Sequence, residues 1–207
     1  ATPDDGTGAI AVDSGKFILT SGLIESTSYG VYLLNNAYAV VNGGEMKSKY
    51  APLTGNNTTG DMNFTVNGGI LTAEFGPAIY MPGQVELKIR DGILNGGISL
   101  RMGQVEISGG TINATDDNID AIESYYNYSG NESYGNSLNL EITGGEFNCE
   151  NSQGSAVAIY DLGRVAQDMT VTISDKAELY TDAKARDAYA VLNLKDLGVD
   201  NIETGYN

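Results

Sequence analysis

One pattern of apolar and polar residues recurs seven times along the chain. Its clearest copy runs from Val105 to Ala114, where apolar and polar residues alternate, a Gly-Gly pair follows, and an apolar residue returns after the pair. Apolar residues two positions apart point to the same face of a strand, so each copy predicts a short strand with one buried face. The alternating apolar pairs are Phe17/Leu19, Ala39/Val41, Phe64/Val66, Leu87/Ile89, Val105/Ile107, Leu140/Ile142 and Val171/Ile173.

A turn sits at the same offset in every copy. The turn pairs are Ser21-Gly22, Gly43-Gly44, Gly68-Gly69, Asp91-Gly92, Gly109-Gly110, Gly144-Gly145 and Asp175-Lys176. A third short apolar run lies between copies, at Gly8–Val12, Gly30–Leu33, Pro77–Met81, Ile98–Met102, Ala121–Ile122, Ala156–Tyr160 and Ala188–Leu192. Each repeat is therefore expected to hold about three short strands and three bends.

The repeat predicts an all-β fold. The shortest repeat, from Ile89 to Ile107, spans 18 residues, which is too short for three strands and a helix. Stacking the copies lets every strand pair with its own copy in the next repeat, as in a parallel β-helix solenoid. Crossovers between parallel strands are nearly always right-handed. We therefore expect a right-handed parallel β-helix of about seven coils.

Two other architectures also use short repeated strands. A leucine-rich repeat requires Leu at fixed offsets and an Asn or Cys ladder, and neither is evident in the sequence. An antiparallel sandwich would place tight hairpin turns between strands at no fixed period, whereas here the turn keeps one offset. The pattern favours the β-helix over both.

The whole chain, residues 1–207, is expected to form one domain with three loop insertions. The insertions lie near residues 47–61, 115–136 and 151–168, where the repeat is interrupted. Residues 188–194 are expected to form a last strand, with a helical cap as the alternative. The one cysteine, Cys149, comes two residues after Phe147 and should face the core as a small hydrophobe.

Charge and composition restrict the possible partners and chemistry. The chain has 27 acidic and 11 basic residues, and its net charge of −16 disfavours nucleic acid and anionic membranes. No transmembrane run is evident, and the first residues, ATPDD, read as a mature start, so we expect a secreted or cell-surface protein. The sequence contains no histidine, which excludes Ser or Cys nucleophiles activated by an imidazole.

The insertion at residues 115–136 gathers acidic and aromatic residues. Hard cations such as Ca²⁺ prefer oxygen ligands, so Asp116, Asp117 and Asp120 are candidate metal ligands, with solvated loop carboxylates as the alternative. Tyrosine rings stack on sugar rings while their hydroxyls bond the sugar edges. The candidate glycan-binding residues are Tyr125, Tyr126, Tyr128 and Tyr134. Other tyrosines that would extend this surface are Tyr29, Tyr32, Tyr50, Tyr80 and Tyr160, and packing against the solenoid is the alternative role for all of them.

Catalysis is a second hypothesis. A polysaccharide lyase needs a base near the carbon acid and a cation that holds the uronate carboxylate, and Lys88, Arg90 and Arg101 are the candidates. These cations are expected at outward positions of neighbouring strands. The alternative is that they form local ion pairs with Glu86, Asp91 and Glu106.

Two segments resemble a known group of proteins. The units ISGGTI (Ile107–Ile112) and ITGGEF (Ile142–Phe147) resemble repeats of bacterial surface proteins with pectate-lyase-like right-handed β-helices. The segment GGTINATDDNIDAIES (Gly109–Ser124) is similar to a unit of a calcium-dependent, polysaccharide-binding family of that type, in which an acidic run follows GGTI. The resemblance implies calcium at Asp116, Asp117 and Asp120, and adhesion or glycan binding without catalysis.

The sequence therefore predicts a non-catalytic, exported bacterial surface module of adhesin or carbohydrate-binding type. It would bind a glycan or another surface partner through loops on a rigid rod, as a monomer within a larger chain. A polysaccharide lyase and a structural spacer of a larger surface protein are the alternatives.

Overall fold

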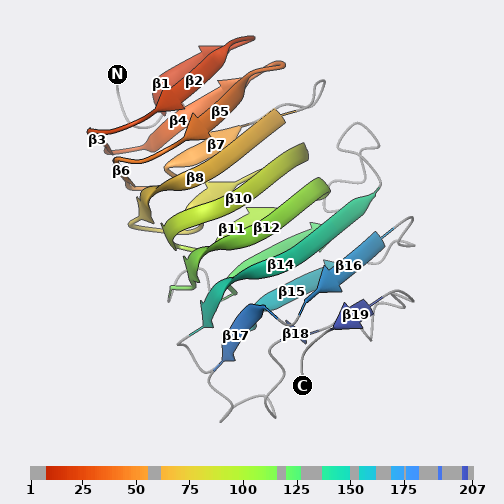
Figure 1. Cartoon of the computed structure of the whole chain (residues 1–207). Coiled ribbons are helices and arrows are strands. Elements are labelled where there is room, and N and C mark those ends of the chain that lie inside the picture. The colour runs from red at the N-terminus through yellow and green to blue at the C-terminus, as the bar shows by residue number, and fades with distance from the viewer. Residues whose placement is uncertain are drawn as a thin grey trace.

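The computed structural model describes residues 8–55, 62–115, 120–126, 137–149, 154–161, 169–174, 176–181, 191–192 and 202–204. Within these residues all regular structure is β-strand, and the strands form two sheets in which the paired strands are parallel (Figure 1). None of the described residues belongs to a helix that could cross a membrane. This is the all-β, parallel arrangement that the repeat predicts.

The strands of each sheet follow one another in sequence order. The eight-stranded sheet holds β1 (Gly8–Asp13), β4 (Tyr29–Leu34), β7 (Leu53–Gly55), β9 (Ile79–Tyr80), β11 (Ile98–Leu100), β13 (Ile122–Tyr126), β15 (Val157–Asp161) and β18 (Val191–Leu192). The main path of the eleven-stranded sheet holds β2 (Lys16–Leu19), β5 (Tyr38–Val41), β8 (Met62–Ala73), β10 (Gln84–Asn95), β12 (Met102–Asn113), β14 (Leu138–Cys149), β16 (Met169–Ile173) and β19 (Ile202–Thr204). Off this path, β3 (Leu23–Ser26) pairs with β6 (Glu45–Ser48), β6 also pairs with β8, and β17 (Ala177–Thr181) pairs with β14.

Equivalent residues of successive repeats pair with each other. Leu87 lies opposite Phe64 on one side and Val105 on the other, so identical positions of the repeat stack into ladders. The inward side chains of both sheets join in one buried apolar cluster. The alternating apolar pairs are buried as predicted, except that Phe17, in the first repeat, is only partly buried. Cys149 is also buried, as predicted.

The glycine turn bends the chain without ending the strand in the middle of the stack. There, β8, β10, β12 and β14 each run through the turn for 12 residues, and only the local pairing is irregular. Separate strands before and after the turn, as the repeat predicts, occur at β2/β3, β5/β6 and β16/β17. The second turn residue supplies a positive φ, for example 95° at Gly69, which glycine adopts at low cost.

The loop predicted for the first insertion, residues 47–61, is wrong for part of its length. Lys47 and Ser48 belong to β6, and residues 51–55 are buried because β7 pairs with both β4 and β9. Residues 56–61 lie outside the described residues. The insertions at 115–136 and 151–168 contain β13 and β15, and their remaining central residues are not described. The strand expected at 188–194 is confirmed over Val191–Leu192.

An asparagine ladder runs along the eleven-stranded sheet. Asn148 donates a hydrogen bond to Asn113 (3.0 Å), Asn113 donates to Asn95 (2.9 Å), and Asn95 donates to Thr72 (3.1 Å). The absence of an Asn ladder, which was expected from the sequence, is therefore wrong. Asn95, Asn113 and Asn148 each follow the second turn glycine by three positions, so the repeat and the pairing register both align these side chains.

Candidate functional site

Four tyrosines gather on the outer side of the eight-stranded sheet, and we call them the tyrosine cluster: Tyr29, Tyr32, Tyr50 and Tyr80. The ring centroids of Tyr29 and Tyr32 are 6.0 Å apart in an edge-to-face arrangement, and those of Tyr29 and Tyr50 are 5.4 Å apart. Tyr80 lies two strands from Tyr32 in the same pairing register, because Tyr32 lies opposite Thr54 and Thr54 lies opposite Tyr80. Both ring separations fall in the range that favours aromatic pairs.

Strand alternation places the rings of Tyr32 and Tyr80 on the outer face. Val31 and Leu33 of β4 are buried in the core, so Tyr32 between them points outward, where it is only half-buried. Burial raises the pKa of Tyr29, and the neighbouring Tyr80, Tyr32 and Tyr50 raise it further. A raised pKa keeps this hydroxyl protonated, so that it can both donate and accept hydrogen bonds at neutral pH.

Arg101 closes one end of the tyrosine cluster. Its guanidinium carbon lies 5.7 Å from the centroid of the Tyr80 ring, and its Nη1 donates to the carbonyl of Leu100 at 3.1 Å. Arg101 was expected at an outward position, and its side chain lies beside the outward Tyr80, where it is only 8% exposed. A buried guanidinium of this kind is suited to holding Tyr80 in place.

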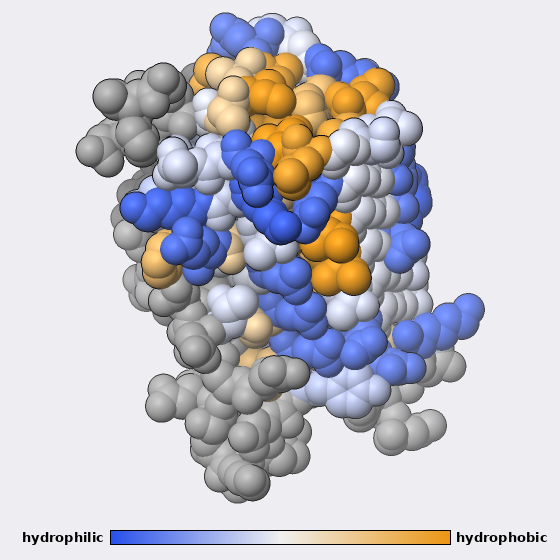
Figure 2. All heavy atoms as spheres, turned by 90° about the vertical axis from the view of Figure 1, so that its left-hand side faces the viewer, coloured by the Kyte–Doolittle hydropathy of each residue, from blue (hydrophilic) through white to orange (hydrophobic). Residues whose placement is uncertain are grey.

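A groove of about 550 Å³ begins beside the tyrosine cluster. We call it the polar groove, and it is lined by Glu25, Ser26, Thr27, Lys47, Ser48, Lys49, Thr72 and Glu74. These residues lie at the ends of β3, β6 and β8 and just beyond them. Figure 2 views the molecule from the side on which Figure 1 labels β3 and β6, and shows hydrophilic side chains over much of this surface.

The polar groove balances its own charges, although the protein as a whole is strongly acidic. It contains two carboxylates, Glu25 and Glu74, and two ammonium groups, those of Lys47 and Lys49. Lys47 forms an ion pair of 2.8 Å with Glu45, which raises the pKa of Lys47. The ammonium of Lys49 instead lies 5.3 Å from the centroid of the Tyr50 ring, within reach of a cation–π interaction.

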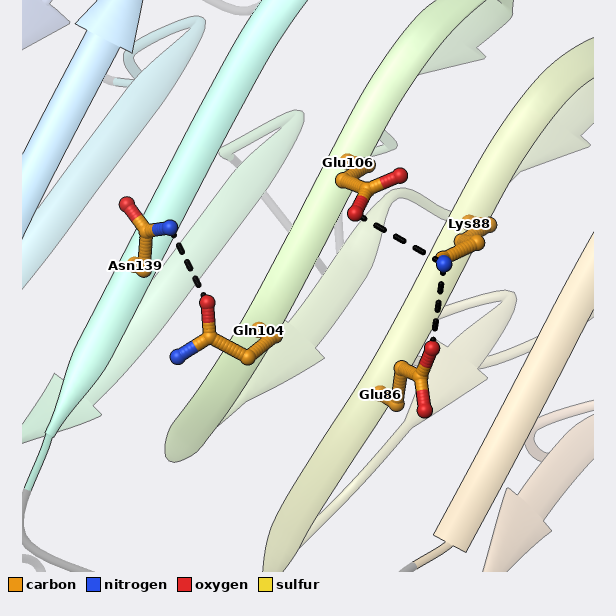
Figure 3. Close-up of polar contacts among 5 residues, drawn as sticks. All are labelled: Glu86, Lys88, Gln104, Glu106 and Asn139. Carbon is orange, nitrogen blue, oxygen red and sulfur yellow. Dashed lines mark hydrogen bonds and ion pairs between the residues drawn. The ribbon is translucent and has the colours of Figure 1, made fainter.

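The eleven-stranded sheet carries a different polar surface. Lys88 lies between Glu86 (3.0 Å) and Glu106 (3.6 Å), and in the same sheet Asn139 donates to Gln104 (2.9 Å; Figure 3). The local ion pairs that the sequence offered as an alternative to catalysis are therefore confirmed for Lys88. The hydrogen bond with Glu86, and then the charge of Glu106, raise the pKa of Lys88.

A raised pKa is the wrong direction for a general base. A lyase base must be deprotonated near the operating pH, and enzymes achieve this for lysine by lowering its pKa. Arg90 donates to Asn67 at 2.9 Å, and Asp91 accepts from the backbone of Gly92 at 2.7 Å. Arg101 lies elsewhere, beside Tyr80, so the structure does not assemble the three candidate cations into one site.

Most of the site residues predicted in the 115–136 insertion lie outside the described residues. These are Asp116, Asp117, Tyr128 and Tyr134. Tyr125 and Tyr126 form the end of β13, where their backbones lie opposite Tyr160 and Asp161. Glycan binding by these tyrosines stays a prediction.

Asp120 is described, and it has a structural contact. The residue is 1% exposed, and its Oδ1 accepts a hydrogen bond of 2.6 Å from the backbone N–H of Ser155. In the part of the chain that the structure describes, no three acidic or sulfur side chains gather as a metal site would require. Asp120 thus links β13 to the segment before β15, and calcium binding by Asp116, Asp117 and Asp120 stays a prediction.

The structure therefore supports a site at the tyrosine cluster and the polar groove better than one in the acidic insertion at residues 115–136. Tyr29, Tyr32, Tyr50 and Tyr80 were only secondary members of the predicted tyrosine surface, but the structure brings the first three rings together and places Tyr80 two strands from Tyr32. The polar groove was not predicted, although Glu25, Lys47 and Thr72 each follow the second turn residue (Gly22, Gly44 and Gly69) by three positions, which is the signal in the repeat that could have found it. Comparisons with protein-family models, curated proteins and solved structures find no match for this chain.

Proposed function

We propose that the chain is a non-catalytic module that binds a glycan at the tyrosine cluster, carried on a right-handed parallel β-helix of about seven coils. The observation that carries the proposal is the contact of the Tyr29 ring with the rings of Tyr32 and Tyr50, with Tyr80 two strands from Tyr32 in the same register. Tyrosine offers a flat apolar ring for a sugar face and a hydroxyl for its edge. Partly buried rings also lose little side-chain entropy when a ligand binds.

The β-helix supports this role by supplying rigidity. Tyr32 and Tyr80 lie on strands of one sheet with Thr54 between them, and the backbone N–H of Tyr50 donates a hydrogen bond of 3.1 Å to the carbonyl of Ser28. The right hand follows from the strong preference of parallel crossovers. Pre-organised rings reduce the ordering cost that otherwise weakens binding.

The proposal places the module outside the bacterial cell, secreted or at the surface, as a monomer within a larger chain. The net charge of −16 argues against nucleic acid as a partner. Lyase activity is not proposed, because the pKa of Lys88 is raised and the three candidate cations do not converge. A spacer without any ligand is the outcome that the following experiment would reveal.

The test compares two tyrosines that are matched in exposure. Tyr50, in the tyrosine cluster, and Tyr38, on the eleven-stranded sheet, are both 38% exposed, and each has a lysine ammonium near its ring, at 5.3 and 4.9 Å. Binding is measured on a glycan array and then by calorimetry. Tyr50→Ala should weaken binding at least tenfold, or about 1.4 kcal/mol, whereas Tyr38→Ala should leave it unchanged.

Three other results would count against a glycan site at the tyrosine cluster. A wild-type protein that binds no glycan would favour the spacer. Loss of binding only in the combined Tyr125→Ala, Tyr126→Ala and Tyr128→Ala variant would assign the site to the insertion predicted from the sequence. Release of unsaturated uronides from pectate, detected by ultraviolet absorbance and lost in Lys88→Ala, would instead support a lyase.

A further inference from the structure

We infer that the polar groove and the tyrosine cluster form one extended site that takes a neutral glycan chain and rejects chains bearing carboxylate or sulfate groups. This inference rests on the proposed function and adds the ligand class and a second set of contacts.

The two surfaces are continuous along the backbone. Thr27, which lines the groove, is two residues before Tyr29, and Lys49, which also lines it, is next to Tyr50. The rings of Tyr29 and Tyr50 are themselves 5.4 Å apart. A chain lying in the groove would therefore reach the aromatic rings without crossing any other part of the protein.

The groove crosses three neighbouring repeats. Glu25 lies opposite Lys47, and Lys47 lies opposite Thr72, so a carboxylate, an ammonium and a hydroxyl follow one another across β3, β6 and β8. Parallel strands are spaced by about 4.8 Å. Such a row suits an extended ligand that offers polar groups at regular intervals. The groove volume of about 550 Å³ also falls within the usual range for ligand sites, about 300–1,000 Å³.

The mixture of charges matches sugar hydroxyls. Each hydroxyl can donate one hydrogen bond and accept others, whereas an ionised carboxylate only accepts and an ammonium only donates. Glu25 and Glu74 can accept from sugar hydroxyls, and Lys49 can donate to them. Hydrogen bonds to charged partners are stronger than neutral ones, so the groove can hold a ligand that has no charge of its own.

The same charges exclude an anionic chain. A carboxylate on the sugar would meet Glu25 or Glu74 in a protein whose net charge is −16. Lys47 is already paired with Glu45 at 2.8 Å, which leaves the ammonium of Lys49 to offset the two carboxylates of the groove. Like charges in one site weaken binding and slow the encounter.

The experiment measures selectivity by calorimetry with hexasaccharides of equal length. The probes are cellohexaose, xylohexaose and mannohexaose as neutral chains and hexagalacturonate as the anionic chain. The wild type should bind at least one neutral chain with an affinity at least tenfold higher than that for hexagalacturonate. The double variant Glu25→Gln/Glu74→Gln keeps an acceptor oxygen at each position but removes both negative charges, so binding of the neutral chain should weaken, binding of hexagalacturonate should strengthen, and the selectivity between them should narrow at least threefold.

A matched control separates the groove from general charge effects. Glu141 is an exposed carboxylate of β14 outside the groove, so Glu141→Gln should leave the selectivity at its wild-type value. If the groove double variant keeps wild-type selectivity while Tyr50→Ala still abolishes binding, the inference is overturned and the proposed function stands. Equal or tighter binding of hexagalacturonate overturns the inference as well. Binding of none of the four probes, with no glycan bound on the array, overturns both.

Discussion

The turns of the repeat allow a test that separates backbone strain from steric crowding. Three glycines at two neighbouring turns differ in these two respects. Gly22 has a φ of 99°, but a Cβ added there would meet no atom within 4 Å. Gly43 lies outside the left-handed region, but its added Cβ would lie 2.8 Å from the carbonyl oxygen of Thr20. Gly44 combines both features, with a φ of 84° and a contact of 2.8 Å to the carbonyl oxygen of Gly22.

The magnitudes follow from the two physical costs. A left-handed backbone conformation costs an L-residue about 1–2 kcal/mol, so Gly22→Ala should lower the free energy of unfolding by about that amount. Forcing a methyl group against backbone atoms costs about 1–3 kcal/mol, which is the loss expected for Gly43→Ala. Gly44→Ala should lose about 2–5 kcal/mol, a large part of the 5–15 kcal/mol that stabilises a typical domain.

Urea unfolding followed by circular dichroism measures these losses. With a constant slope, the shift of each midpoint converts directly to a change in the free energy of unfolding. The stacked arrangement requires Gly44→Ala to be the most damaging of the three, because only its added Cβ is both strained and pressed against the preceding repeat. Equal losses for Gly22→Ala and Gly44→Ala would refute the close stacking of the turns.

Three further predictions concern the polar contacts. Asn113→Ala removes two ladder hydrogen bonds, of 2.9 and 3.0 Å, and should lower the free energy of unfolding in urea by about 1–3 kcal/mol. Asn139→Ala removes one exposed hydrogen bond and should lower it by less, and equal losses for the two variants would argue against the ladder. Asp120→Ala should lower the free energy of unfolding by about 1–3 kcal/mol in EDTA as well as in millimolar calcium, because the described partner of Asp120 is the backbone of Ser155. A loss of stability seen only in calcium, together with a calcium-dependent melting temperature in the wild type, would assign Asp120 to a metal site. The pKa of Lys88 is raised by Glu86 and Glu106, so its ion pairs stabilise the fold below the unfolded pKa of about 10.4 and this contribution is lost as the pH rises through the higher folded pKa. The difference in free energy of unfolding between the wild type and Lys88→Met should therefore be constant from about pH 6 to 9 and shrink above about pH 10.5. A difference that stays constant at alkaline pH and disappears only at acidic pH would contradict the ion pairs.

The sequence by itself determined the repeat, its inward face and its turns. Alternation of apolar residues and a glycine pair at a fixed offset are local properties, and each copy repeats them independently, so residues such as Leu87 and Val105 could be assigned to the core without coordinates. The short strand β7 could not be found this way. It has only three residues, directly after Pro52, and it becomes a strand because β4 and β9 pair with it on both sides.

Only the tertiary structure decided which polar and aromatic side chains meet. The repeats have unequal lengths, so the distance along the chain between Tyr29, Tyr50 and Tyr80 does not reveal that they share one face. Arg101, between β11 and β12, shows the limit of the alternation rule, since alternation with Leu100 and Met102 predicts an outward side chain but not that this side chain is buried beside Tyr80. Periodicity tells which face of a strand a residue occupies, whereas the neighbours on that face are set by the register between strands and by what packs over them.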